Sequence, residues 1–374
     1  MRRRHVLVAG FAVGVLTALA VVATTGWSGL WRQAAGLTSS NSLSTPAPSA
    51  NATPATSPHA TPTPAGVPVV QNGDRPVQRG GPVMVYDPEN HGVIMFGGSA
   101  FTPTADGSNS VALGDTWLWS GQRWSQLNVQ GPSPRSASVA AYDSVRHVIV
   151  LFGGSGPGGI GPAKLFDDTW TWDGATWTKQ FPAHQPNARF DAAMAFDQRR
   201  GVTVMYGGLG QTETYDATWI WDGTDWTLKD PPSTPGARHF FSMAYDEAVG
   251  VTVLFGGTLP GQRLNDTWTW DGLTWTRQQA LPPVASGWSF LAYDSATKEV
   301  VAYIYFGLDN HPVAEFTITW DGTQWTDRTS TRDPSPRVGI ALAFDPDTNQ
   351  VVMFGPANAP ETWIWDGATW SVYS

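Results

Sequence analysis

Two side chains that could transfer a proton interrupt segments otherwise made of small or apolar residues: Asp191 and His239. Each lies one or two residues after an arginine, Arg189 or Arg238, in consecutive segments of similar sequence. A carboxylate beside an imidazole can work as a general acid–base pair. We therefore take Asp191 and His239 as the candidate catalytic residues. The structural alternative is that both are hydrogen-bonded polar residues of a wet channel.

Arginine recurs at one position, eight residues before an aspartate that follows an aromatic residue. The five arginines are Arg79, Arg135, Arg189, Arg238 and Arg337. A second position, two residues before a tryptophan-rich stretch, holds Asp115, Asp168, Asp266 and Glu361. Guanidinium and carboxylate groups form bidentate ion pairs. We predict a structural brace between the two positions. The alternative is a ring that binds an acidic ligand, with the five arginines as its binding residues.

Composition limits other chemistry. The chain has no cysteine, which excludes a thiol nucleophile, disulfides and a zinc–thiolate site. Its seven histidines are scattered, and no two of them have the spacing of a local metal site. We therefore expect neither a metal nor a cofactor. The net charge of −9 argues against nucleic acid as a partner.

The segments that must position these residues repeat about every 50 residues, a period typical of propellers and solenoids. The unit 135–180 reads RSASVAAYD, HVIVLFGG, DTWTWDG and TWTKQ in order. Each piece alternates or is apolar over a strand's length, and the Asp-Gly step indicates a hairpin. Each unit is thus predicted to be a four-stranded antiparallel meander. Six units fit between Arg79 and Ser374.

Tryptophan is the outlier of the composition, with 20 copies. Most occur as a triplet, such as Trp170, Trp172 and Trp177, repeated in each unit with the single exception of Ile318. Meanders stacked around an axis bury both faces of each sheet, and tryptophan supplies a large area for that contact. We predict that the triplets pack between units. A sugar-stacking platform is the alternative.

The aromatic-Gly-Gly strand end, as in Phe152-Gly153-Gly154, and the tryptophans that follow it resemble the kelch family over residues 79–374. The resemblance implies an all-β, six-bladed propeller, with the first strand of each unit at the channel and the fourth outermost. Kelch propellers mostly bind proteins or glycans. A few are enzymes: a galactose oxidase-like copper site is excluded because it needs a cysteine, whereas a sialic acid mutarotase or lyase remains the alternative.

The N-terminus predicts membrane attachment. Arg2 to Arg4 precede an uncharged apolar stretch, Val6 to Thr24, long enough to cross a bilayer core of about 30 Å. We therefore expect a signal anchor or transmembrane helix over residues 1–27, with a cleaved signal peptide and secretion as the alternative. Residues 28–66, rich in Ser, Thr, Pro and Ala, are predicted to be a disordered linker. The propeller would occupy residues 67–374.

Loop length distinguishes the two ends of the predicted propeller. The turns after the first and third strands are short and nearly identical in all units, whereas the loops after the second strand vary from Ser99–Gly114 to Pro356–Pro360. Variable loops on a rigid frame commonly carry recognition. We expect a monomeric module, tethered to the cell membrane outside the cytoplasm, that binds a protein or glycan on this loop-rich face.

One segment is left over from this assignment. Val67–Asn72 precedes the first arginine and has the length of a strand. Because the sixth unit ends with a fourth strand of its own, TWSVYS, we predict that all six blades are built from contiguous chain and that Val67–Asn72 is a surplus strand or strap.

Overall fold

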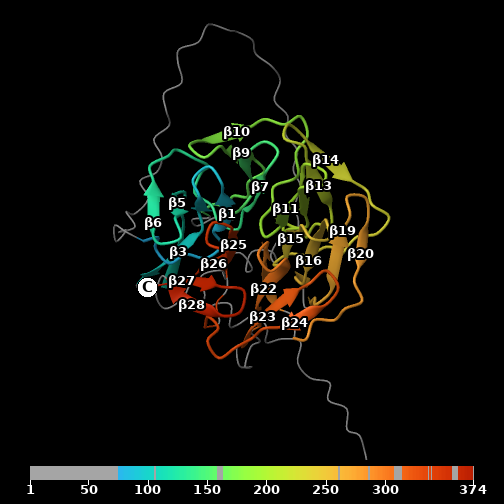
Figure 1. Ribbon diagram of the computed structural model, residues 1–374. Helices are drawn as coiled ribbons and strands as arrows, with labels where there is room; N and C mark the ends of the chain where they lie inside the picture. Colours follow the sequence, from blue (N-terminus) through green and yellow to red (C-terminus); the bar gives the residue numbers. More distant parts are fainter. Residues whose placement is uncertain are drawn as a thin grey trace, which may run out of the picture.

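The computed structural model describes residues 75–104, 107–157, 163–259, 262–284, 287–306, 314–335, 337, 339–355 and 361–373. These residues form six four-stranded antiparallel sheets, numbered here as blades 1 to 6 in chain order. The blades surround a central axis, and the first strand of each contacts the first strands of its two neighbours (Figure 1). The predicted six-bladed all-β propeller is confirmed.

Blades 1 to 3 are each built from one repeat unit, in the order expected for a meander. Blade 1 contains β1 (Val83–Asp87), β2 (Gly92–Phe96), β5 (Thr116–Trp119) and β6 (Trp124–Leu127). Blade 2 contains β7 (Val139–Asp143), β8 (Val148–Phe152), β9 (Thr169–Trp172) and β10 (Trp177–Gln180). Blade 3 contains β11 (Ala193–Asp197), β12 (Val202–Tyr206), β13 (Thr218–Trp221) and β14 (Trp226–Lys229).

Blades 4 to 6 follow the same order. Blade 4 contains β15 (Ser242–Asp246), β16 (Val251–Phe255), β19 (Thr267–Trp270) and β20 (Trp275–Arg277). Blade 5 contains β21 (Trp288–Asp294), β22 (Glu299–Phe306), β23 (Ala314–Trp320) and β24 (Trp325–Asp327). Blade 6 contains β25 (Ala341–Asp345), β26 (Gln350–Gly355), β27 (Glu361–Trp365) and β28 (Trp370–Tyr373). Two small hairpins lie in the loops after β2 and β16: β3 (Ser99–Thr104) with β4 (Gly107–Ala112), and β17 (Thr258–Leu259) with β18 (Gln262–Arg263).

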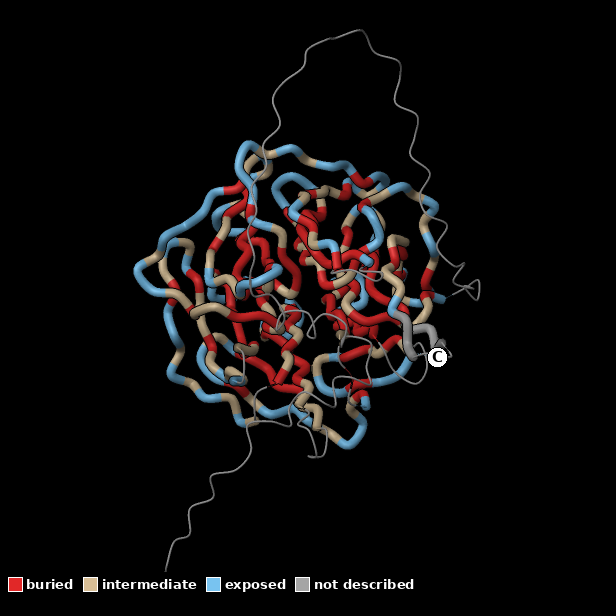
Figure 2. The backbone as a smooth tube through the Cα atoms, turned by 180° about the vertical axis from the view of Figure 1, so that it is seen from behind, coloured by how far each residue is buried: buried red, intermediate tan, exposed pale blue. Residues whose placement is uncertain are grey.

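Burial is greatest in the second strand of a blade and least in the fourth, because the second strand has neighbouring blades on both faces and a strand along each edge. The first strand, beside the axis, is only partly buried in some blades, as in β1. All five residues of β2 are buried, whereas β28 exposes every residue after Trp370. In Figure 2 the buried chain accordingly occupies the interior and the exposed chain the outside. The runs of apolar residues in the second strands and the mixed sequence of the fourth strands follow from this difference.

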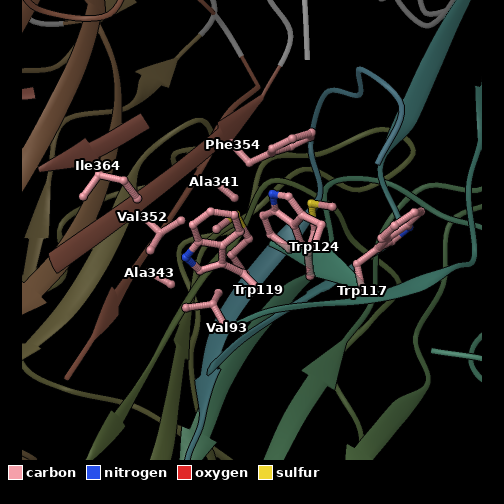
Figure 3. Packing of buried hydrophobic residues seen from close by; sticks show 11 residues of the cluster. Val93, Trp117, Trp119, Trp124, Ala341, Ala343, Val352, Phe354 and Ile364 are labelled. Carbon is pink, nitrogen blue, oxygen red and sulfur yellow. The ribbon is translucent and has the colours of Figure 1, made fainter. Parts of the chain in front are cut away.

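Hydrophobic clusters fill the six contacts between adjacent blades, which we call seams. The cluster between blades 6 and 1 contains Trp119 and Trp124 from blade 1 and Val352 and Phe354 from blade 6 (Figure 3). Each of the other five seams holds a cluster of its own. The second and third tryptophans of every triplet pack together with ring centroids 5.3–5.6 Å apart. The predicted packing role of the triplets is confirmed.

A hydrogen bond from tryptophan to threonine crosses every seam. The third tryptophan of a blade donates from Nε1 to the Oγ1 of a threonine in the third strand of the preceding blade. The six pairs are Trp124–Thr362, Trp177–Thr116, Trp226–Thr169, Trp275–Thr218, Trp325–Thr267 and Trp370–Thr317, at 2.8–3.0 Å. The repeated threonine therefore stabilises the seams, because the indole of the third tryptophan has its acceptor in the preceding blade.

The ring closes without exchange of a strand. β28 is the outer strand of blade 6, so all six blades are contiguous, as predicted. The seam between blades 6 and 1 has the same Trp–Thr bond as the others. Val67–Asn72, the linker and the N-terminal segment lie outside the described residues. Within the described ranges, no helix is long and apolar enough to cross a membrane.

Candidate functional site

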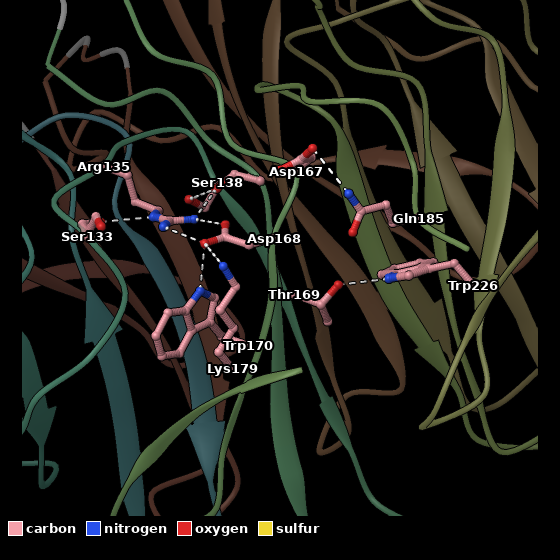
Figure 4. A network of polar contacts seen from close by, with 11 residues as sticks. Ser133, Arg135, Ser138, Asp167, Asp168, Thr169, Trp170, Lys179, Gln185 and Trp226 are labelled. Carbon is pink, nitrogen blue, oxygen red and sulfur yellow. Dashed lines mark hydrogen bonds and ion pairs between the residues drawn. The ribbon is translucent and has the colours of Figure 1, made fainter. Parts of the chain in front are cut away.

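The predicted arginine brace is formed, and blade 2 shows its parts (Figure 4). Arg135 pairs with Asp168 through two hydrogen bonds of 2.6 and 3.2 Å and donates a third, of 3.0 Å, to the carbonyl of Gly153. Trp170 Nε1 donates to the same carboxylate at 2.9 Å. The Arg135 side chain is fully buried and Asp168 is 13% exposed. All of these partners belong to one blade.

The contacts of the arginine with the acid, and of the tryptophan with the acid, recur in three further blades. Arg79 and Arg238 also donate to a glycine carbonyl, whereas Arg337 Nη1 is buried with no hydrogen-bond partner among the described residues. Arg79 pairs with Asp115 at 2.6 and 2.9 Å, and Arg238 pairs with Asp266 at 2.9 and 3.2 Å. The contact of Arg337 with Glu361 is longer, at 3.5 Å. In each case the first tryptophan of the triplet donates to the carboxylate. The guanidinium groups therefore already have anionic partners within the protein.

The backbone of the same arginines joins neighbouring blades. The Arg135 carbonyl accepts from Gly98 N at 2.8 Å, and its N–H donates to Leu113 O at 2.9 Å, both in blade 1. The preceding glycine, Gly97, has a φ of +69°, and a Cβ there would lie 2.6 Å from the Arg135 carbonyl oxygen. The Gly-Gly pair is thus required by the close approach of the next blade. Each brace acts inside its blade through the side chain and across the seam through the backbone.

The braced carboxylates are held in their charged form. Burial alone would raise the pKa of Asp168, but the hydrogen bond and charge of Arg135 outweigh it, and the pKa lies below its usual value. The pKa values of Asp115 and Asp266 are lowered against burial in the same way by Arg79 and Arg238. The ion pairs therefore stabilise the fold at neutral pH.

Blades 3 and 5 depart from this network. In blade 3 the acidic position is Ala217, and Arg189 stacks over Tyr215 at 4.0 Å while donating to the Gly207 carbonyl at 2.9 Å. Burial lowers the pKa of Arg189 to about 10. Trp219 Nε1 is buried with no hydrogen-bond partner among the described residues. In blade 5 the three positions hold Ser286, Phe316 and Ile318, so all parts of the network are replaced together.

A cavity of about 200 Å³ lies on the axis at the loop-rich end of the propeller. Every blade contributes four consecutive residues to it, at and just before the start of its first strand. These are residues 81–84, 137–140, 191–194, 240–243, 288–291 and 339–342. Most are small or apolar, and the only titratable side chain among them is Asp191.

The residue two positions after the arginine comes first in each set, and the six such residues form what we call the axial ring. Its members are Gly81, Ala137, Asp191, Phe240, Trp288 and Gly339, in blades 1 to 6. Backbone hydrogen bonds of 2.7–3.1 Å link Gly81 to Gly339, Ala137 to Gly81, and Asp191 to Ala137. Ala137, Asp191 and Phe240 have left-handed φ values of 54°, 50° and 55°, and Gly81 and Gly339 share this conformation at 64° and 68°. The left-handed backbone is therefore a property of the ring position in most blades and does not distinguish Asp191 and Phe240.

The ring has one polar and two aromatic side chains, all from adjacent blades. The Oδ2 atom of Asp191 is buried without a hydrogen-bond partner among the described residues, and burial raises the pKa of this carboxyl well above its usual value. Phe240 and Trp288 are half-buried and stack with ring centroids 4.6 Å apart and an interplanar angle of 30°. Tyr305 lies beside Trp288 with a centroid distance of 5.9 Å. Opposite them the ring has no side chain larger than the methyl of Ala137.

The predicted pairing of Asp191 with His239 is not formed. His239 is buried but does not line the cavity, and its Nε2 lies 3.3 Å from Thr258 Oγ1. Burial lowers the pKa of His239 to about 4 and raises that of Asp191, and the charge of neither group contributes to the shift of the other. The two residues are one position apart in the repeat, which directs His239 towards β17 and Asp191 towards the axis.

Sequence reasoning missed Phe240 and Trp288. Both were counted among the apolar residues expected on inner strands, so their size was overlooked. A comparison of the six units at the position two after the arginine would have found them, because the other members are aspartate, alanine and two glycines. Among the described residues, no group of three or more potential ligands could hold a metal ion.

Comparison with known proteins adds no further assignment. No protein-family model matches the chain, and no curated protein matches it. The function must therefore be argued from the site.

Proposed function

We propose that this protein is a kelch-type binding module that takes its ligand at the loop-rich end of the axis, with Asp191, Phe240 and Trp288 at the contact. The observation that carries the proposal is the axial ring itself. The arginine, the aspartate after an aromatic residue, the first glycine, the threonine and the three tryptophans of each unit are nearly invariant, whereas the ring position differs strongly from blade to blade. Repeat proteins depart from their pattern mainly where function requires it.

The polarity of the site supports binding over catalysis. Enzyme reactions on sugars, such as mutarotation or elimination, need proton donors and acceptors in contact with the substrate. The cavity contains one titratable side chain, Asp191, and His239 lies outside it. The carbohydrate-active enzyme alternative consequently has less support than a binding module without a cofactor.

The arginines have a structural part in this proposal. Arg79, Arg135 and Arg238 are almost completely buried and hold carboxylates in bidentate pairs. An acidic ligand would have to displace Asp115, Asp168 or Asp266, at the cost of leaving a buried carboxylate without its partner. Arg189, which has no carboxylate partner in the described part of the chain, is the one member whose loss could affect binding of an anion.

The N-terminal sequence supports display outside the cytoplasm. Three arginines followed by an uncharged apolar stretch favour an anchor whose N-terminus stays inside the cell. The linker of residues 28–66 would then separate a monomeric propeller from the membrane. A protein or glycan in the extracytoplasmic space is the expected partner.

Glycan and peptide arrays probed with the full-length protein test the proposal. We expect a defined set of ligands whose binding is lost in Trp288→Ala. Leu273→Ala is the matched control, because Leu273 is 76% exposed in the turn after β19, at the opposite end of the propeller. Ligands that bind equally to wild type and to Trp288→Ala would move the site away from the axial ring.

A further inference from the structure

The chemistry of the axial cavity is set by one carboxyl group without a counter-charge. Asp191 is the sole titratable residue of the lining, and its Oδ2 is buried without a partner among the described residues. A buried carboxylate is stable only when paired or hydrogen-bonded. The Asp191 carboxylate thus needs a positive charge or a hydrogen-bond donor beside it, and a ligand can supply either one.

The other polar side chains of the lining, three serines, already have hydrogen-bond partners. Ser138 Oγ donates to the Gly153 carbonyl at 2.9 Å, and Ser289 Oγ donates to the Phe255 carbonyl at 2.8 Å. Ser242 Oγ accepts from Leu291 N at 3.1 Å. These serine side chains therefore offer few free partners to the hydroxyl groups of a sugar ring, which disfavours a sugar here. A single carboxyl is likewise too few ligands for a calcium or magnesium ion.

The aromatic wall favours a cation. Phe240 follows Asp191 in the ring, Trp288 follows Phe240, and Tyr305 extends the aromatic surface beside Trp288. Aromatic faces carry a negative potential that attracts ammonium groups, and tryptophan gives the strongest interaction. Among the described residues, no lysine, arginine or histidine lines the cavity; His239, whose ring centroid lies 4.8 Å from that of Phe240, lies outside the lining.

From these contacts we infer that the axial cavity binds a compact organic ammonium group, with Asp191 as its counter-ion and Phe240 and Trp288 as its aromatic wall. The inference rests on the proposed function, since it names the ligand chemistry of the same site. The cavity of about 200 Å³ is below the range of about 300–1,000 Å³ usual for drug-sized ligands, so it suits a headgroup and not a larger molecule. Such a group could be a free methylated ammonium or the side chain of a lysine.

Binding of a cation is coupled to a proton. The carboxyl must be ionised in the complex, and burial raises its pKa in the free protein. Below that pKa the incoming ammonium releases the carboxyl proton to the buffer, so affinity should rise by about tenfold per pH unit and then level off above it. Among the described residues, no other titratable side chain lines the cavity to add a second transition.

Calorimetric titration of the full-length protein tests the inference. The probes are tetramethylammonium, choline and N-acetyl-lysine methylamide, each in two buffers of different ionisation enthalpy, and 3,3-dimethylbutanol serves as the uncharged analogue of choline. We expect at least one ammonium probe to bind, with proton release at pH values below the native pKa of Asp191, and choline to bind at least about tenfold more tightly than its analogue. Comparison of choline with the lysine derivative separates a free ligand from a side chain.

Variants define the site. Asp191→Asn should abolish ammonium binding, Trp288→Ala should weaken it by about tenfold, and Leu273→Ala should leave it unchanged. The inference is overturned if no ammonium probe binds at millimolar concentration, if the uncharged analogue binds equally well, or if Asp191→Asn binds normally. If an array ligand without an ammonium group requires Trp288, the inference fails while the proposed function stands. If no ligand requires the ring residues, both fail.

Discussion

Blades 6, 1 and 2 and blades 3, 4 and 5 form two halves of one ring, yet they differ at the positions nearest the axis. In the first, or regular, half the ring residues are Gly339, Gly81 and Ala137, and every blade has its arginine paired with an acid. In the second, or variable, half they are Asp191, Phe240 and Trp288. Only blade 4 of the variable half retains the complete network.

The difference teaches which features hold the propeller together. The Trp–Thr bonds and seam clusters are present in both halves, so the fold depends on them everywhere. The arginine network can be replaced, because blade 5 forms without it. Blade 5 has longer strands instead: β22 has eight residues, whereas β2 and β8 have five each. Within the described ranges, buried polar atoms without hydrogen-bond partners occur in both halves, for example Asp191 Oδ2 and Trp219 Nε1 in the variable half and Arg337 Nη1 in the regular half. Of these three, only Asp191 lines the axial cavity.

The largest effect should come from removing a braced arginine. Arg135→Ala leaves Asp168 without its main partner and should lower the free energy of unfolding by about 3–5 kcal/mol. Arg189→Ala is the matched control from the variable half. Arg135 stacks on the Phe166 ring at 3.7 Å and Arg189 on the Tyr215 ring at 4.0 Å. Each arginine also donates to a glycine carbonyl. Urea unfolding should show a clearly smaller loss for Arg189→Ala, and equal losses would mean that the carboxylate adds nothing.

The seam bonds should give the next largest effect. Thr169→Val leaves Trp226 Nε1 buried without an acceptor and should cost about 1–3 kcal/mol. Thr203 is the control, because it is also fully buried but its Oγ1 has no partner among the described residues. Thr203→Val should be neutral or slightly stabilising by thermal and urea unfolding. A neutral Thr169→Val would remove the Trp–Thr bond from the features that define the seams.

Restoring the missing acid in blade 3 should give a smaller gain. The backbone is already in place, since Gly207 N donates to Ala217 O at 3.2 Å as Gly153 N does to Asp168 O. Ala217→Asp should pair with Arg189 and accept from Trp219, and should raise the free energy of unfolding by about 1 kcal/mol. The same urea titration measures it. A loss of stability instead would show that the two halves differ in backbone and not only in side chains.

Much of the fold could be predicted from the sequence because the repeat encodes it locally. Strand boundaries, the hairpin turns and the Arg–acid pairs follow from spacing alone, as in Arg135 and Asp168. Ring closure also followed, from the presence of a fourth strand in the last unit. The seam bond between Trp226 and Thr169 was not predicted, because it joins different units and the spacing within one unit does not show which neighbour supplies the acceptor.

The site was predicted only in part. Asp191 was found because a carboxylate is conspicuous on an inner strand. Its pairing with His239 was wrong in physical terms: adjacent repeat positions point in different directions, one to the axis and one to the loop strand. Phe240 and Trp288 escaped notice because apolar residues are expected in such strands. Only the closing of the ring brings these three units to a common cavity.

One matched pair of substitutions tests the central claim, that regular positions stabilise the fold and ring positions serve the site. Burial raises the pKa of Asp191, so its contribution to stability is present below the unfolded value of about 3.9 and is lost as pH rises through the native pKa. Despite burial, Arg135 holds the pKa of Asp168 low. The contribution of Asp168 to stability is therefore present above about pH 3.9 and is lost as pH falls through the native pKa.

The measurement is the free energy of unfolding of Asp191→Asn and Asp168→Asn, against wild type, from pH 4 upward in steps. At neutral pH we predict that Asp191→Asn is more stable than wild type and Asp168→Asn less stable; as the pH falls towards about 4 the Asp191→Asn difference should shrink, whereas the Asp168→Asn difference should persist, because its loss begins only below about 3.9. A loss of stability in both variants at neutral pH would contradict the account, because Asp191 would then be a structural residue like Asp168.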